Sequence, residues 1–181
     1  MDDNSLLWTM EEKHQLLHTP IFDVESMHMR SATGIDGDYV NIKAPDWMVV
    51  LAVDGDDFIL VRQWRFGCAQ ITTEFPAGIV EKGEKPEECA YRELLEETGY
   101  RAGKITVLGS CCPNTAFFSN QLTVCLAEDL VDTGEQHPDP DEVITYLKVP
   151  IREVIDKYCT GEYVHAYMGT ALALYMRKCL L

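Results

Sequence analysis

The sequence has little positive charge for its length. Acidic side chains number 30 against 15 basic ones, which gives a formal net charge of −15 over 181 residues. A chain with this balance repels phosphate polyanions, so we expect it not to bind nucleic acid independently of sequence. An anionic ligand would need cations to mediate its contact with such a protein.

Cysteine pairing patterns and membrane signals are also missing. The seven cysteines are odd in number and have no CxxC spacing, which favours reduced thiols over a disulfide framework or a zinc site. The first residues are acidic, with no basic segment before an apolar one, and no run approaches ~18 apolar residues. We therefore expect a cytoplasmic location and no membrane as partner.

The pattern that is present predicts one globular domain with a small extension. A hydrophobic content of 46% suffices for a packed core. Residues 21–42 alternate and turn like a β-hairpin, which must pack on the main domain or on a second copy, because two strands alone are marginal. We expect residues 1–44 to form this extension and residues 45–181 the main domain.

The main domain has the pattern of a mixed α and β structure. WMVVLAV and FILVRQWR flank the acidic turn DGDD and predict a hairpin in the centre of a sheet. Residues 86–98 start with Pro86 and precede Gly99, which predicts a helix. Further strands are expected in ITVLGSC, QLTVCLA and ITYLKV, and further helices over 150–158 and 164–181.

The predicted helix carries carboxylates on one face. At about 100° per residue, Glu93 and Glu97 lie about 40° apart, and Glu96 lies about 60° to the other side. Like charges at this spacing destabilise an isolated helix, so something must offset their repulsion. A divalent cation such as Mg²⁺ would do so, because it binds carboxylate oxygens, water and phosphate. The spacing alone leaves an ordinary solvated acidic face as the alternative.

A glycine-bearing loop, GIVEKGE, leads into this helix and extends the pattern. From Gly78 to Tyr100 the chain follows the pattern G-x5-E-x7-R-E-U-x-E-E-x-G-U, where U is a bulky aliphatic residue. Every position with a fixed residue type is met, and the one departure is Tyr100 at the last U position. This segment resembles the signature of the Nudix hydrolases. The resemblance implies an α+β fold, an αβα sandwich with a mixed β-sheet, that hydrolyses a nucleoside diphosphate linked to another group by using Mg²⁺ or Mn²⁺.

The resemblance also implies roles for single residues. Glu93 and Glu97 would be the principal metal ligands. Glu96 would hold or bridge a further metal, the carbonyl of Ala77 would complete a shell, and Arg92 would orient the glutamates. Metals held in this way would neutralise pyrophosphate charge and activate a water.

Sequence outside the signature is similar to the Nudix branch that hydrolyses ADP-ribose and ADP-sugars. VRQWRFG and TTEFPAG resemble this branch, and Pro113 matches a proline near the substrate-covering loop, although Asn114 replaces the usual glycine. Arg65 is the candidate for a phosphate or ribose contact, with a surface salt bridge as the alternative. Glu74 would accept from the ribose or base, or else pair with Arg65.

The acidic loop HPDPDEV resembles the loop that often supplies a base or metal partner in this branch. Glu142 is the candidate, with Asp139 and Asp141 as rivals and a solvated loop as the alternative. Glu96 or Glu97 could equally take the proton. A base on a loop would allow closure around substrate to assemble the site.

Aromatic and histidine side chains give weaker signals. Trp47 and Phe22 are candidates for stacking on a base, although burial in a strand is the more common role of such residues. His28, His137 and His165 have no ligand spacing, and we interpret them as structural or surface residues.

The leading hypothesis is a Mg²⁺-dependent enzyme that takes a nucleotide sugar and cleaves ADP-ribose to AMP and ribose 5-phosphate. The resemblance further implies a homodimer in which the N-terminal extensions exchange. One alternative is a Nudix hydrolase for a GDP-sugar, a dinucleotide or a nucleoside triphosphate. Another is a catalytically silent nucleotide sensor, which the presence of Glu84, Glu93, Glu96 and Glu97 disfavours.

Overall fold

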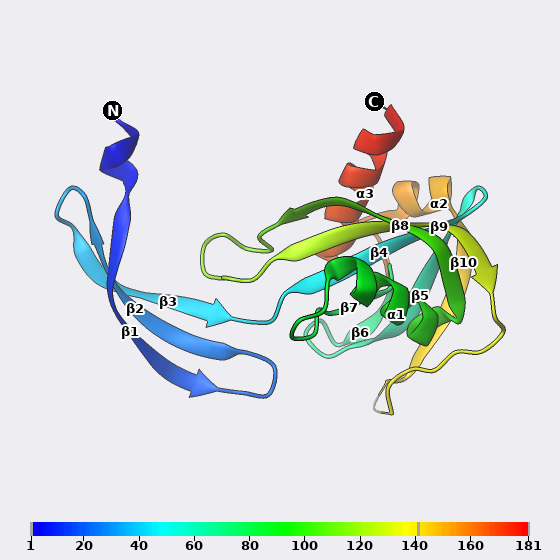
Figure 1. Cartoon of the computed structure of the whole chain (residues 1–181), viewed down its shortest axis with the longest axis horizontal. Helices are drawn as coiled ribbons and strands as arrows, with labels where there is room; N and C mark the ends of the chain where they lie inside the picture. Colours follow the sequence, from blue (N-terminus) through cyan, green and yellow to red (C-terminus); the bar gives the residue numbers. More distant parts are fainter. Residues whose placement is uncertain (1, 141, 181) are drawn as a thin grey trace. The chain divides into compact units, whose positions relative to one another are not determined.

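The computed structural model describes residues 2–140 and 142–180, and the chain divides into two compact units. The smaller unit comprises Met1–Pro45 and Cys112–Gln121, and the larger one comprises Asp46–Cys111 and Leu122–Leu181 (Figure 1). The sequence prediction had assigned residues 112–121 to the main domain. These residues group instead with the N-terminal segment, since the Ile42 N–H donates to the Phe117 carbonyl at 2.7 Å.

The smaller unit is built on a three-stranded antiparallel sheet. Its strands are β1 (Trp8–His18), β2 (Asp23–Ser31) and β3 (Asp36–Lys43), preceded by the short 3-10 helix η1 (Asp3–Leu6). β2 and β3 form the hairpin predicted from the sequence. β1 was not predicted, because all 11 of its residues are exposed and no buried face imposes an alternating pattern.

The larger unit is built on a mixed sheet with the strand order β10-β5-β4-β9-β8. β4 and β9 are parallel, and the other described pairs are antiparallel. Two short strands complete the sheet, since β6 pairs with β5 and β7 pairs with β4. The strands are β4 (Trp47–Asp54), β5 (Asp57–Arg65), β6 (Gln70–Glu74), β7 (Ala77–Ile79), β8 (Tyr100–Cys111), β9 (Leu122–Asp132) and β10 (Ile144–Pro150).

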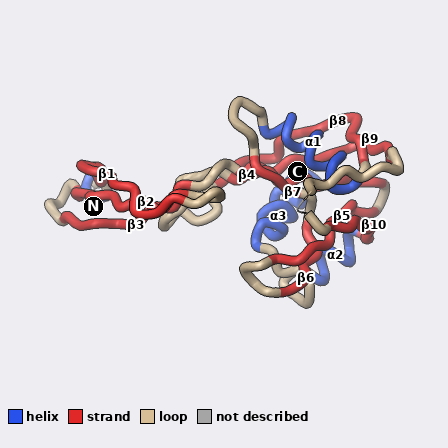
Figure 2. Tube along the Cα trace, turned by 90° about the horizontal axis from the view of Figure 1, so that it is seen from below, coloured by secondary structure: helices blue, strands red, loops and turns tan. Residues whose placement is uncertain are grey.

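Helices cover both faces of this sheet, as Figure 2 shows. β4 serves both layers, because Met48 and Val50 pack with α1 (Pro86–Thr98) whereas Val49 and Leu51 pack with the other helices. Those helices are α2 (Ile151–Lys157) and α3 (Ala166–Leu180). The result is the predicted αβα sandwich. Among the described residues, none of the helices combines the length and apolarity needed to traverse a bilayer.

Strands β4 and β5 separate on the side of the sheet where the site residues lie. The two strands pair only near their turn, from Ala52 opposite Ile59 to Asp54 opposite Asp57. Beyond that point β6 pairs with β5 and β7 pairs with β4, so the chain crosses the gap between the separated strands. The Val50 N–H donates to the Pro76 carbonyl at 2.9 Å and fixes this crossing.

Candidate active site

One cavity of the larger unit gathers most of the predicted site residues. Its volume is about 670 Å³, a size that suits a ligand such as a nucleotide. Strands β4 to β7, helix α1, the acidic loop before β10 and the start of α3 all contribute to its lining. The predicted site residues that line it are Arg65, Glu74, Ala77, Arg92, Glu93, Asp139 and Glu142.

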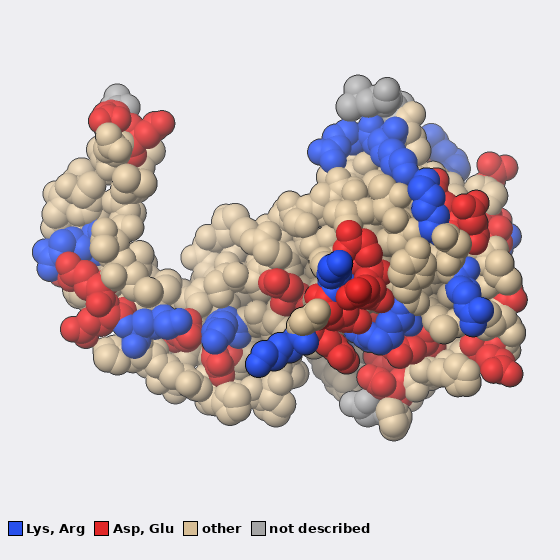
Figure 3. All heavy atoms as spheres, in the orientation of Figure 1, with Lys and Arg blue, Asp and Glu red and all other residues tan. Residues whose placement is uncertain are grey.

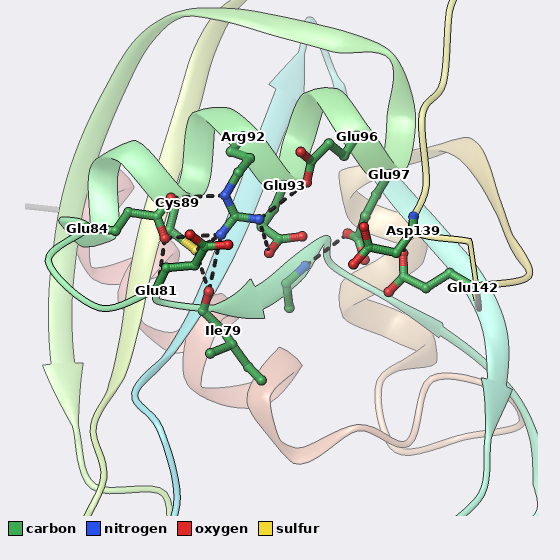
Figure 4. Close-up of polar contacts among 11 residues, drawn as sticks. Ile79, Glu81, Glu84, Cys89, Arg92, Glu93, Glu96, Glu97, Asp139 and Glu142 are labelled. Carbon is green, nitrogen blue, oxygen red and sulfur yellow. Dashed lines mark hydrogen bonds and ion pairs between the residues drawn. The ribbon is translucent and has the colours of Figure 1, made fainter. Parts of the chain in front are cut away.

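Arg92 holds together the carboxylates of α1 and of the loop before it. Its guanidinium donates two hydrogen bonds of 3.0 Å to Glu84, one of 2.7 Å to Glu93 and one of 3.2 Å to Glu96 (Figure 4). Another bond of 3.2 Å reaches the Ile79 carbonyl. Acidic side chains gather over α1 on the face drawn in Figure 3. Arg92 therefore offsets part of their repulsion, which suits the orienting role predicted for it.

Glu97 lies deepest among the helix carboxylates. It is 2% exposed and accepts a 3.1 Å hydrogen bond from the Ala77 N–H. Burial, reinforced by the charge of Glu93, raises the pKa of Glu97 well above its ordinary value. Burial likewise raises the pKa of Glu93 to about 7. Glu97 therefore does not lie on a solvated surface, and the alternative of an ordinary acidic face is wrong for this residue.

The oxygens around this helix suit a hard divalent cation. The carboxylates of Glu93, Glu96 and Glu97 and the carbonyl of Ala77 are the donor types that Mg²⁺ and Mn²⁺ prefer. Within residues 2–140 and 142–180, no three acidic, histidine or cysteine side chains already converge into a cation site. Glu93 and Glu96 bond to Arg92 instead. A bound cation would compete with Arg92 for these two carboxylates.

Gly78 explains how Glu93 reaches this position. A methyl group at Gly78 would overlap the Glu93 carboxylate, which packs directly over strand β7. The glycine that opens the sequence signature is therefore required by close approach of a side chain.

Arg65 and Glu74 form a second polar group on the cavity. The Arg65 guanidinium donates two hydrogen bonds of 3.0 and 2.8 Å to the Glu74 carboxylate, which also accepts from the Thr72 hydroxyl. Burial alone would raise the pKa of Glu74, but the bonds from Arg65, the charges of His165 and Arg65 and the bond from Thr72 together lower this pKa. Pairing with Arg65, one of the two expectations for Glu74, is thus observed. The Arg65 side chain keeps 38% of its surface exposed.

The acidic loop contributes Asp139 and Glu142. The Glu142 N–H donates to the Asp139 carbonyl at 2.9 Å, and the Asp139 N–H donates to the Glu142 carboxylate at 3.3 Å. Figure 4 draws both side chains at the Glu97 end of α1, and the charge of Glu142 adds to the raised pKa of Glu97. The rival candidate Asp141 lies outside the described residues.

Known proteins resemble this chain over most of its length. The NUDIX domain family matches residues 43–166. ADP-ribose pyrophosphatase from Bacillus subtilis is 33% identical over 145 residues, 79% of this chain and 78% of that protein. ADP compounds hydrolase NudE from Escherichia coli is 28% identical over 157 residues, 85% of this chain and 83% of that protein. The chain belongs to the Nudix family.

A solved structure extends the comparison to the Nudix fold. A crystal structure of an ADP compounds hydrolase aligns with a TM-score of 0.84 at 25% identity, covering 96% of this chain and 94% of that one. The predicted family and fold class are confirmed. Nudix hydrolases in general use divalent metal ions, which agrees with the oxygen-rich face of α1.

The cavity lining does not include four of the predicted residues of this Nudix chain, which are Glu96, Glu97, Pro113 and Phe22. Pro113 belongs to Cys112–Gln121, the segment between β8 and β9 that groups with the smaller unit. Phe22 also belongs to the smaller unit, whereas Trp47 does line the cavity. Sequence reasoning placed Pro113 by its distance from the signature, which does not show to which unit the loop returns.

The structure adds lining residues that the sequence analysis did not assign to the site. His165, interpreted as structural or surface, lies on the cavity with Tyr167, and so does Glu81. The rings of His165 and Tyr167 meet edge to face at 4.7 Å, and Tyr167 meets Trp47 in the same way at 5.2 Å. No spacing in the sequence marks these residues, since the start of α3 meets β4 and β6 only in the folded chain.

Proposed function

We propose that this Nudix chain hydrolyses the pyrophosphate bond of ADP-ribose or a closely related ADP-sugar, releasing AMP and a sugar phosphate. For ADP-ribose, the second product is ribose 5-phosphate. The observation that carries the proposal is one cavity that is lined by Glu93 and Arg92 of α1 and by the half-buried guanidinium of Arg65. The names of the two similar proteins, an ADP-ribose pyrophosphatase and an ADP compounds hydrolase, support this substrate class.

Mg²⁺ is the proposed cation, with Mn²⁺ as the alternative. Glu93 and Glu97 would be its principal ligands, assisted by Glu96 and the Ala77 carbonyl. When bound, the cation would neutralise charge on the pyrophosphate and lower the pKa of the attacking water. The metal-ligand roles are supported by the shared bond of Glu93 and Glu96 to Arg92 and by the bond of the buried Glu97 to the Ala77 backbone.

The remaining roles fall to side chains on the other walls of the cavity. Glu142 would accept the proton of the attacking water, with Asp139, Glu96 and Glu97 as rivals. Arg65 donates to Glu74 through Nε and Nη2, so its Nη1 group would be the one to meet a substrate phosphate. Glu74 would hold Arg65 in this orientation.

A substrate panel tests the proposal. Product release would be measured from ADP-ribose, ADP-glucose, GDP-mannose, dinucleotides and nucleoside triphosphates, each with Mg²⁺ or Mn²⁺. Preference for ADP-ribose or another ADP-sugar is the expected result. Preference for another diphosphate would replace the substrate and keep the reaction type, whereas tight binding without turnover of any compound would contradict the proposed hydrolysis.

We also propose a cytoplasmic homodimer formed through the N-terminal sheet. The smaller unit exposes large apolar side chains, and patches of this kind commonly mark protein contacts. These side chains include Leu6, Leu7, Trp8, Met10, Leu16 and Leu17. Light scattering on the full chain should give a dimer that Leu16→Asp weakens, and a monomer at micromolar concentration would contradict the proposal. The cysteine pattern supports the cytoplasmic location.

A further inference from the structure

His165 lies where the aromatic wall of the cavity meets the Arg65 and Glu74 pair. Its Nε2 atom is 3.8 Å from the Glu74 carboxylate, and 30% of its side chain is exposed. Its ring packs edge to face on Tyr167. His165 is therefore neither a core residue nor a free surface residue, and it belongs to neither the signature nor the carboxylate face.

The backbone fixes which nitrogen of His165 carries the proton. The Tyr167 N–H donates to Nδ1 of His165 at 3.2 Å, so the lone pair of Nδ1 is occupied. The neutral ring then carries its hydrogen on Nε2. This N–H group faces the Glu74 carboxylate.

The segment that carries His165 is anchored to the strands that carry Arg65 and Glu74. Glu162 accepts two hydrogen bonds from Arg62 of β5 and one of 3.0 Å from the Thr73 hydroxyl of β6. The Glu162 carbonyl also accepts the Thr73 N–H at 2.9 Å. Glu162 thus anchors the chain before His165, and the bond from the Tyr167 N–H orients the ring.

Glu74 depends on its donors, because its side chain is only 3% exposed. A buried carboxylate that loses a donor bears a large desolvation cost. A substrate phosphate at Nη1 of Arg65 would share the positive charge of the guanidinium with Glu74. Besides the Thr72 hydroxyl, which already donates to Glu74, the Nε2–H of His165 at 3.8 Å is a further donor that faces this carboxylate.

We propose that His165 is a positioning residue that supports Glu74 and thereby keeps the Arg65 guanidinium facing the substrate pyrophosphate. The inference rests on the proposed function, in which Arg65 contacts that pyrophosphate. Loss of this support should weaken substrate binding more than the chemical step, since His165 does not touch the reacting atoms.

Two amide variants of His165 distinguish the role of Nε2 from that of Nδ1. In His165→Gln the amide N–H reaches the Nε2 position, whereas in His165→Asn the amide reaches only the Nδ1 position. For ADP-ribose with Mg²⁺, we expect His165→Asn to raise KM roughly fivefold to tenfold with kcat within about twofold, and His165→Gln to restore KM to within about twofold. An unchanged KM in His165→Asn, or equal impairment of both variants, would overturn the proposal.

A second measurement needs no turnover. Nitrogen-15 NMR of the substrate-free protein should show the Nε2–H tautomer of His165 near neutral pH, with the Nε2 resonance displaced in Glu74→Gln. A hydrogen on Nδ1, or no response to Glu74→Gln, would overturn the inference. If neither ADP-ribose nor another ADP-sugar is a substrate, the proposed function fails, and the two amide variants are compared on the substrate that the panel selects.

Discussion

Two arginines on the cavity differ in how fully their guanidinium groups are hydrogen-bonded within the protein. Arg92 donates to three carboxylates and to the Ile79 carbonyl, so its hydrogen bonds are taken up within the protein. Arg65 donates to one carboxylate and stays partly exposed. We infer that Arg92 organises the metal ligands, whereas Arg65 is available to an anionic substrate.

Glu97→Gln should abolish activity and preserve the fold. The amide keeps an acceptor for the Ala77 N–H but removes the negative charge that a cation requires. Loss of a metal ligand removes several kcal/mol of transition-state stabilisation, so kcat should fall at least about 100-fold. Because the charge of Glu97 is buried, thermal unfolding should occur at the same temperature or higher. Retention of more than a tenth of the parent kcat would contradict this role.

Glu74→Gln tests the buried pair through its pH dependence. The pKa of Glu74 is lowered from its ordinary value of 4.5, so the pair stabilises the fold above that pH and loses its effect as the pH falls through the folded-state pKa. Urea unfolding should show a loss of about 1–3 kcal/mol in the variant at neutral pH, and the difference should shrink below pH 4.5.

The exposed Glu135 offers a control for this experiment. Its side chain is 77% exposed, so Glu135→Gln should leave the free energy of unfolding nearly unchanged at every pH. A difference between Glu74→Gln and the parent that stays constant from neutral pH to pH 3 would count against the lowered pKa of Glu74.

At this scale the sequence predicts some contacts and cannot predict others. The Arg65 and Glu74 pair was anticipated as an alternative, because both residues lie on short segments that lead into the signature. The position of His165 was not anticipated, since 91 residues separate it from Glu74. Only the packing of α3 against the sheet brings the two together.

Among the elements, helix α1 organises both the carboxylates and the acidic loop. Its carboxyl end is met by the segment after β9, where the Thr133 N–H donates to the Gly99 carbonyl at 3.0 Å and the His137 N–H to the Glu96 carbonyl at 2.9 Å. These bonds cover the end of the helix and direct the chain toward Asp139 and Glu142.

Gly99→Ala should be more harmful than Gly134→Ala. Both glycines have a φ of +73°, so each substitution carries the left-handed backbone cost of about 1–2 kcal/mol. At Gly99 the added Cβ would also lie 2.7 Å from the backbone oxygen of Glu135, whereas nothing lies within 4 Å at Gly134. Chemical denaturation should show the larger loss for Gly99→Ala, and equal losses would contradict the close packing of the helix end.

Elements with strong local signals were predicted well. The helix expected over 86–98 is α1, because Pro86 and Gly99 fix its ends, and the apolar runs of β4 and β5 are strands. Strands β6 and β7 were missed, since they are short and Pro76 separates them. They form because β4 and β5 part, a long-range event with no local pattern.

For the whole molecule, the acidic balance predicts that activity depends on added cations. A protein with a formal net charge of −15 repels an anionic substrate unless cations intervene. Removal of divalent ions with a chelator should therefore abolish hydrolysis, and excess Mg²⁺ should restore it. Activity that survives thorough chelation would show that the carboxylates of α1 do not work as metal ligands.

The most direct test of the account is to identify the products formed from ADP-ribose in the presence of Mg²⁺. Cleavage of the pyrophosphate bond predicts AMP and ribose 5-phosphate in equal amounts, with one oxygen atom from labelled water in one of the new phosphate groups. Release of free ribose with ADP, or no product from any compound of the panel, would contradict it.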